Sequence, residues 1–198
     1  MGSDTKTALL DLAEYTVRSR GFDGFSYADL ANAFGIRKAS IHYHFPTKAN
    51  LSEALIERYQ TRFQCRLTDI ASANATAGAR LRALVALYRE ALHEGQTVCL
   101  CVAFSSSRES LSETVISRLG MFRSMVLQWI TAVFELGQTD NTILALHQPK
   151  QEAHATLAML EGAHIAARAE QDITLFDAAT FILNARCLVH TSSGHSTL

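Results

Sequence analysis

The sequence predicts an all-α protein. It contains only two prolines in 198 residues, and its apolar residues recur over long segments with the 3.6-residue period of helices. Hydrophobic residues make up 48% of the chain, which is enough to bury a substantial core. We expect a small N-terminal domain of three helices over residues 1–48, a larger helical domain over residues 49–190 and a disordered tail over residues 191–198.

Two glycines mark the ends of the first two predicted helices. The first helix covers residues 5–20 and stops at Gly21, which tolerates the left-handed backbone of a helix end. Ser26 and Asp29 have the spacing of a capping box and predict the start of the second helix. Gly35 ends that helix, because it accepts a positive φ without strain.

A short third helix is predicted over residues 38–44. It must end there, because Pro46 disfavours helical geometry at the residue before it. Thr47 is a good N-cap for a long, amphipathic fourth helix that reaches about residue 72. The small, polar segment 71–78 is expected to link the N-terminal module to the rest of the chain.

Periodicity predicts five further helices. Pro149 suits the first turn of the fourth of these, and Thr174 with Asp177 suits an N-cap followed by an acid for the last. The predicted ranges are roughly 79–94, 101–107, 110–137, 150–170 and 175–190.

Charge and hydropathy limit the possible partners. The net charge of −1 argues against a uniformly basic nucleic-acid coat, yet residues 37–48 hold three basic residues, two histidines and no acid. No apolar run reaches the ~18–20 residues that span a bilayer, and the N-terminus does not have the pattern of a secretory signal. We therefore expect a cytoplasmic protein with no membrane partner.

The four cysteines and the absence of catalytic motifs argue against an enzyme. Cys65, Cys99, Cys101 and Cys187 have neither a C-x-x-C nor a zinc-like spacing, so free thiols and no metal are expected. The sequence contains no G-x-S-x-G, H-E-x-x-H, P-loop or dinucleotide-binding glycine pattern. No cofactor is expected either.

The second and third predicted helices, with a glycine in the turn between them, have the geometry of a helix-turn-helix. The short helix carries groups that can donate hydrogen bonds to base edges and phosphates, and the next helix begins with a further cation. These candidate DNA-binding residues are Arg37, Lys38, Ser40, His42, Tyr43 and Lys48. Composition alone leaves a solvated basic turn as an equal alternative.

The stretch AFGIRKASIHYHFPTKANL resembles the helix-turn-helix motif of the TetR family of bacterial transcriptional regulators. The resemblance covers the first 60 residues and implies a DNA-binding repressor. It also implies that Ser26, Lys38, Ser40, His42, Tyr43 and Lys48 face DNA, whereas Ile41 and Phe45 pack the domain. His42 departs from the family, which usually has tyrosine there, so that phosphate contact is in doubt.

The same resemblance implies that the larger domain binds an effector and that its last two long helices form a four-helix dimer interface. An apolar stripe in the last helix is consistent with such a dimer interface, although a stripe could equally be internal core. A palindromic operator requires a two-fold protein, which favours a homodimer. The candidate interface residues are Ala179, Ile182, Leu183 and Arg186.

Two effector mechanisms stay open from the sequence. The stretch VCLCVAFSSSRESLSETVISRL resembles the branch of the family that contains the N-ethylmaleimide-reductase repressor, which implies that Cys99, with Cys101 nearby, senses reactive electrophiles or oxidants. A buried pair of thiols without that role is the alternative. A reversible small molecule could instead occupy an apolar pocket lined by Phe104, Phe122, Met125, Trp129, Leu157, Glu161 and His164.

Two other functions are kept as alternatives. Glu90 with His93 and Glu161 with His164 each have the Glu-x-x-His spacing found in helical di-iron oxidases. No obvious glutamates from the other helices complete such a site, so this alternative is weak. A helical adaptor with a degenerate DNA-binding domain is the other alternative, and Lys38, Tyr43 and Lys48 argue against it.

Overall fold

The computed structural model describes residues 2–188, with side chains from residue 5 onward, and confirms an all-α fold over that range. The predicted disordered tail, residues 191–198, lies outside the described residues. None of the described helices combines the length and hydropathy needed to cross a bilayer. The α-helices are α1 (Gly2–Arg20), α2 (Tyr27–Phe34), α3 (Lys38–His44), α4 (Lys48–Ala73), α5 (Ala77–Glu90), α6 (Leu100–Ser105), α7 (Glu113–Asp140), α8 (Pro149–Glu170) and α9 (Thr174–Ala185), with a 3-10 helix η1 (Arg108–Ser110) before α7.

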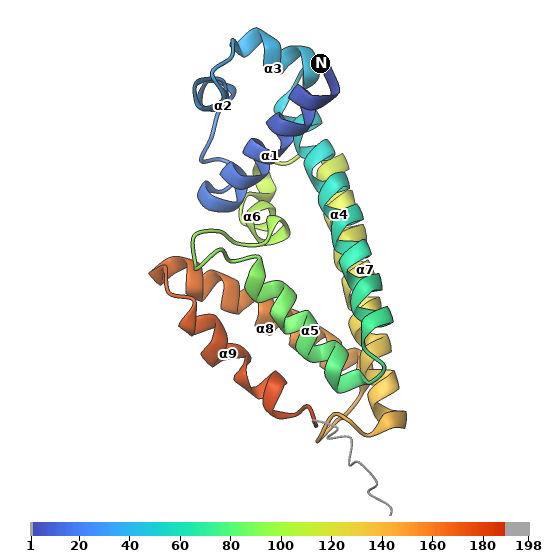
Figure 1. Cartoon of the computed structure of the whole chain (residues 1–198). Coiled ribbons are helices and arrows are strands. Elements are labelled where there is room, and N and C mark those ends of the chain that lie inside the picture. Colours follow the sequence, from blue (N-terminus) through green and yellow to red (C-terminus); the bar gives the residue numbers. More distant parts are fainter. Residues whose placement is uncertain (1, 189–198) are drawn as a thin grey trace, which may run out of the picture.

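Helices α1, α2 and α3 form the upper end of the molecule (Figure 1). The capping box predicted at Ser26 is present, because its side chain accepts from the Asp29 N–H and the Asp29 carboxylate accepts from the Ser26 N–H. Gly35 has φ 73°, the left-handed conformation that ends α2. Ile41 in α3 is fully buried, and α3 packs against α2.

Helix α4 runs from the small upper domain along the side of the larger one, next to α7 (Figure 1). Of the segment 71–78 that was predicted as a linker, only residues 74–76 lie outside helices, and they connect α4 to α5. Helices α5, α8 and α9 complete the larger domain. Helix α6 lies between the two domains and contacts α1 and α4.

Several predicted helix ends shift in the structure. Pro149 is in the first turn of α8 as expected. Thr174, however, does not cap α9: the Asp172 carboxylate accepts from the Thr174 N–H and hydroxyl instead. Helix α9 ends at Ala185, because an isolated bridge between Ile143 and Cys187 follows it.

Candidate nucleic-acid interface and effector cavity

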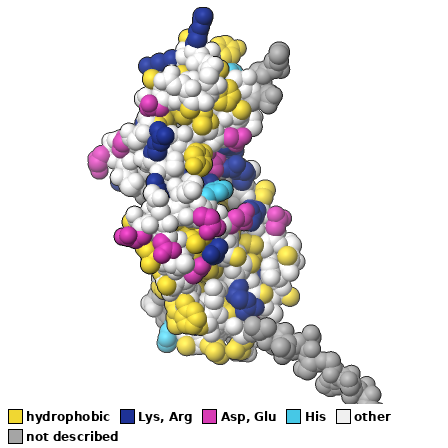
Figure 2. All heavy atoms as spheres, turned by 60° about the vertical axis from the view of Figure 1, so that its left-hand side comes forward, with side chains coloured by type: hydrophobic (Ala, Val, Ile, Leu, Met, Phe, Trp, Pro, Cys, Tyr) yellow, Lys and Arg dark blue, Asp and Glu magenta, His cyan; other side chains and the backbone are white. Residues whose placement is uncertain are grey.

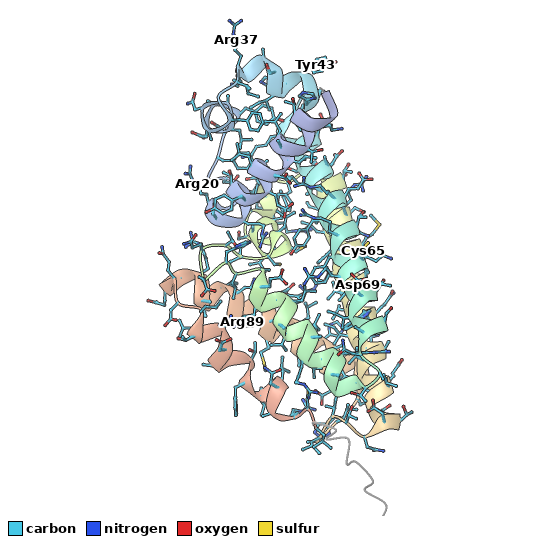
Figure 3. All side chains as sticks on the ribbon, in the orientation of Figure 1. Arg20, Arg37, Tyr43, Cys65, Asp69 and Arg89 are labelled. Carbon is cyan, nitrogen blue, oxygen red and sulfur yellow. The ribbon has the colours of Figure 1, made fainter. Side chains whose placement is uncertain are left out.

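Helix α3 turns a polar face to solvent at the far end of the molecule. Arg37, Lys38, Ser40 and Tyr43 are all exposed, and the Tyr43 side chain is 83% exposed. Figure 3 shows Arg37 pointing away from the body of the protein, with Tyr43 at the other end of the same helix. Because Ile41 anchors the opposite side of α3, the polar groups are presented on a fixed helix. Their contact with DNA stays a prediction.

Two of the candidate DNA-binding residues also have partners within the chain. The His42 ring lies 4.9 Å from the Tyr27 ring, and its Nδ1 is 3.1 Å from the Pro46 carbonyl oxygen. The Ser26 hydroxyl lies 2.7 Å from the Asp29 carboxylate in the capping box. Both residues remain exposed, so these contacts orient them without covering them.

Lys48 has partners within the chain, so its predicted phosphate contact stays a prediction beside a second role. Its ammonium donates to the Phe22 and Phe25 carbonyl oxygens at 2.6 and 2.9 Å, and lies 4.1 and 4.3 Å from the centroids of the same two rings. Partial burial lowers the pKa of Lys48. The cation therefore fastens the loop between α1 and α2 to the start of α4, a role that the motif did not reveal.

A polar network ties α1 to the larger domain. The buried Glu14 carboxylate forms ion pairs with Arg58 and Arg62 of α4 and lies 3.6 Å from Arg18. Arg18 donates to the Ala91 and Val98 carbonyl oxygens, in the segment that leads from α5 to α6. Sequence reasoning missed this cluster, because its members are far apart in the chain.

A cavity of about 300 Å³ lies between α6, η1, α7 and α8. Four residues predicted for effector binding line it: Cys101, Phe122, Leu157 and Glu161. Its remaining lining includes Arg123, whose guanidinium donates to both Glu161 carboxylate oxygens at 2.9 and 2.7 Å. Leu157 and Phe122 are almost completely buried, so the inner wall is apolar.

The other residues predicted for the effector pocket do not line this cavity. Met125 and Trp129 are partly buried and pack against the core. Phe104 is completely buried and its ring lies 5.7 Å from that of Phe22. The cavity therefore lies nearer the start of α7 than Trp129 does.

Cys99 and His164 form part of the core beside the cavity. The Cys99 N–H donates to His164 Nδ1 at 3.0 Å, and His164 Nε2 is 2.9 Å from the Tyr88 carbonyl oxygen. Cys99 is buried, and its Sγ accepts from the Val102 N–H at the start of α6. A hydrogen bond from Cys101 lowers the pKa of Cys99, whereas burial raises the pKa of Cys101.

The structure does not support the di-iron alternative. Glu90 pairs with Arg66 and is the last residue of α5, whereas His93 lies beyond it with φ 43°. Glu161 pairs with Arg123, and His164 already uses both ring nitrogens. Among the side chains that the structure describes, residues 5–188, no three of His, Cys, Asp or Glu converge as metal ligands.

Helices α8 and α9 carry an exposed apolar face. Phe181, Ile182 and Ile165 are 68%, 50% and 57% exposed. Small exposed residues surround them on both helices: Ala155, Ala158, Gly162, Ala169, Ala178, Ala179 and Ala185. We call these residues together the α8–α9 face; Figure 2 shows hydrophobic side chains scattered over the lower half of the molecule on the side that Figure 1 shows at the left.

One predicted interface residue, Leu183, is corrected, and another, Arg186, has partners within the chain. Leu183 is only 2% exposed and belongs to the chain's own core. Arg186 forms an ion pair with Glu152 at 2.9 Å and donates to the Leu144 and Ala145 carbonyl oxygens. Ala179 and Ile182 remain candidates, and Phe181 and Ile165 were missed because the sequence does not show which apolar residues a helix leaves uncovered.

Comparison with known proteins bears on the family and the fold of the chain. Residues 9–55 match the family described as bacterial regulatory proteins, tetR family. The chain is similar to the HTH-type transcriptional repressor NemR of Escherichia coli strain K12, at 25% identity over 170 residues that cover 83% of this chain and 84% of the relative. A TetR-family transcriptional regulator from Agrobacterium tumefaciens is similar in structure, with a TM-score of 0.89 at 26% identity, over 96% of this chain and 100% of that one. The reduced form of E. coli NemR has the same fold, with a TM-score of 0.77 at 22% identity, over 93% and 97% of the two chains.

Proposed function

Because the chain belongs to the TetR family of bacterial regulatory proteins, we propose that it is a homodimeric transcriptional repressor that an effector releases from operator DNA. The exposed polar face of α3, which the buried Ile41 anchors to the three-helix domain, carries this proposal. In a helix-turn-helix protein the second helix lies in the major groove, and its first residues meet the base edges. Arg37 and Lys38 occupy that place, while Ser40 and Tyr43 supply further donors.

A second copy bound through the α8–α9 face would complete the DNA-binding unit. One short helix gives little sequence specificity, whereas two related by a two-fold axis can read half-sites one helical turn, about 34–36 Å, apart. An exposed Phe181 beside Ile182 is the kind of apolar anchor that a dimer interface covers. We expect the two α8–α9 faces to form a four-helix bundle.

We expect effector binding to release the protein from DNA through the contacts of α6. Cys101 of α6 lines the cavity, and Phe104, one turn further on, contacts Phe22 between α1 and α2. The Phe22 carbonyl oxygen in turn holds Lys48. A ligand that displaces α6 would therefore move the DNA-binding domain and change the spacing of the two α3 helices. A difference of about 3 kcal/mol between the two states changes operator affinity more than a hundredfold.

Thiol modification is the second route to release, and Cys99 is its candidate. A thiolate reacts faster than a thiol, and the contacts of Cys99 lower its pKa. Cys99 is buried, so a reagent would have to reach it through an opening of α6. Cys65 is exposed on α4 (Figure 3), and a Cys65→Ser background therefore separates any effect of Cys99 from trivial surface modification.

The proposal predicts that α3 reads sequence. The wild-type protein should select a palindromic site from a random DNA pool, and Lys38→Ala should weaken binding to that site at least tenfold while affecting random DNA less. Gel-shift titrations at two salt concentrations measure both. Arg89→Ala removes the same charge far from α3, where Arg89 pairs with Asp177, and should bind like wild type. A Lys38→Ala protein that keeps full affinity and selectivity would refute the assignment of α3.

A further inference from the structure

The cavity is not sealed on the side of α7 and α8. A surface groove of about 740 Å³ runs between α1, α6 and α8, and three residues line both the groove and the cavity: Ser105, Arg123 and Glu161. The ion pair between Arg123 and Glu161 therefore stands where the two spaces meet. In the single chain its side chains are 49% and 22% exposed, so solvent reaches the pair from the groove.

Both spaces carry an excess of positive charge. Arg108 and Arg123 line the cavity against one acid, Glu161. The groove is lined by Arg18, Arg20, Arg123 and Arg168, again against Glu161 alone. Arg18 and Arg168 also hold backbone carbonyl oxygens of the neighbouring segments, which fixes their position at the groove. Arg18 lies 3.6 Å from the buried Glu14 carboxylate, so the excess of positive charge rests mainly on Arg20, Arg108 and Arg168, and it favours entry of an anion from this side.

Apart from the ion pair, Arg108 and Ser105, the cavity lining is apolar. Leu157, Phe122 and Val126 form a buried wall, and Leu111, Ile116 and Leu119 contribute further apolar surface. At the ~30 Å³ that a water molecule occupies in the liquid, the cavity has room for roughly ten non-hydrogen atoms. Its dimensions and polarity thus match a small molecule with one polar end and an apolar body.

We propose that the effector is an apolar organic anion of about this size, with its carboxylate or sulfonate on Arg123 at the junction and its body in the cavity between α7 and α8. This assignment rests on the proposed function, since it names the ligand class of the proposed effector cavity. The ligand's carboxylate replaces that of Glu161 as the bidentate partner of Arg123, and Glu161 turns toward the solvent in the groove. Arg108 supplies the second cation.

Sodium octanoate is a suitable probe, because it has ten non-hydrogen atoms and one carboxylate. Isothermal titration of the full-length protein without DNA should show saturable binding of octanoate. Octan-1-ol, which has the same chain without the charge, should bind at least tenfold more weakly, and octylammonium should give no saturable heat. Equal binding of octanoate and octan-1-ol would overturn the choice of an anion, and absence of octanoate binding would overturn the ligand class.

Two substitutions at the junction should act in opposite directions. Arg123→Gln should weaken octanoate binding at least tenfold, because the anchoring cation is lost. Glu161→Gln should strengthen it severalfold, because the competing carboxylate is lost. A purely structural role of the pair would instead make both variants weaker binders. Arg89→Gln and Asp177→Asn break another exposed ion pair that lines neither space, and both should bind octanoate like wild type.

A separate readout keeps this proposal distinct from the function it rests on. In a gel-shift assay the ligand-free protein should retard the DNA site that it selects. Octanoate should reduce the retarded fraction with wild type but not with Arg123→Gln. If the protein binds DNA but not octanoate, only the ligand class fails. If it binds octanoate but never DNA, the repressor function fails and the cavity assignment stands.

Discussion

His164 is held at both ring nitrogens in one protonation state. Its Nδ1 accepts from the Cys99 N–H, so the proton is on Nε2, which donates to the Tyr88 carbonyl oxygen. Burial lowers the pKa of His164 to about 4 from an ordinary value of 6.5, and the nearby Arg18 acts in the same direction. The neutral ring therefore connects α8 and α5 to the residue that begins α6.

This histidine should make the protein less stable in acid. Between pH 6.5 and about 4 the unfolded chain binds a proton at His164 that the folded chain does not, so the free energy of unfolding falls as the pH is lowered. The full loss is about 3 kcal/mol. Urea unfolding at pH 7 and pH 5 should show a smaller pH dependence in His164→Gln than in wild type. Replacing the exposed His154 of the same helix should leave the pH dependence of the free energy of unfolding as in wild type. The same pH dependence in wild type and His164→Gln would contradict the assignment.

The difference between a motif and its geometry is clearest at Lys48. The sequence motif located Lys48 beside the short helix, and that proximity made a phosphate contact the natural expectation. The direction of the Lys48 side chain depends on where the Phe22 and Phe25 carbonyl oxygens lie. These oxygens belong to a loop whose path follows from tertiary packing. For the same reason Glu14 and Arg58 could not be paired from sequence, since 44 residues separate them.

Helices with a clear start signal could be placed from the sequence almost to the residue. The capping box at Ser26, the glycine after α2 and Pro149 at α8 are local devices whose energetics do not depend on the rest of the fold. The ends of α5 and α9 could not be placed so well. Helix α5 stops at Glu90 before a turn in which His93 and Glu94 have positive φ, and that turn is held by Arg18 from α1.

Helix α7 offers a test of helix propensity separate from packing. Gly120 lies inside this helix, and a Cβ added there would meet no atom within 4 Å. Gly120→Ala should therefore raise the free energy of unfolding by roughly 0.5–1 kcal/mol, because alanine loses less backbone entropy. Gly35→Ala should lower it by about 1–2 kcal/mol, because Gly35 has φ 73°. Urea unfolding curves measure both changes, and a destabilised Gly120→Ala would show that the space around Gly120 is filled.

At the scale of the whole molecule, periodicity predicted the all-α architecture that the structure confirms, whereas the division into a DNA-binding and an effector-binding domain stays an expectation from the family resemblance. What could not be predicted is which apolar residues stay uncovered once the chain has folded. Leu183 and Ile182 are neighbours in one apolar run, yet one is in the core and the other is half exposed. The α8–α9 face emerges only after α5 and α8 have covered the opposite side of α9.

Dimerisation through this face gives the last prediction. Phe181 is 68% exposed in the single chain, so Phe181→Arg should leave the fold intact while placing two uncompensated charges in the dimer interface, at a cost of roughly 3–5 kcal/mol. Sedimentation should show a monomer with unchanged helical circular dichroism, and affinity for the palindromic site should fall because only one α3 helix can bind. Met121→Arg alters another exposed apolar residue, on α7, and should remain a dimer. A Phe181→Arg protein that sediments as the wild-type dimer would place the interface on another surface, and the spacing of the two α3 helices would then have to be derived from that surface instead.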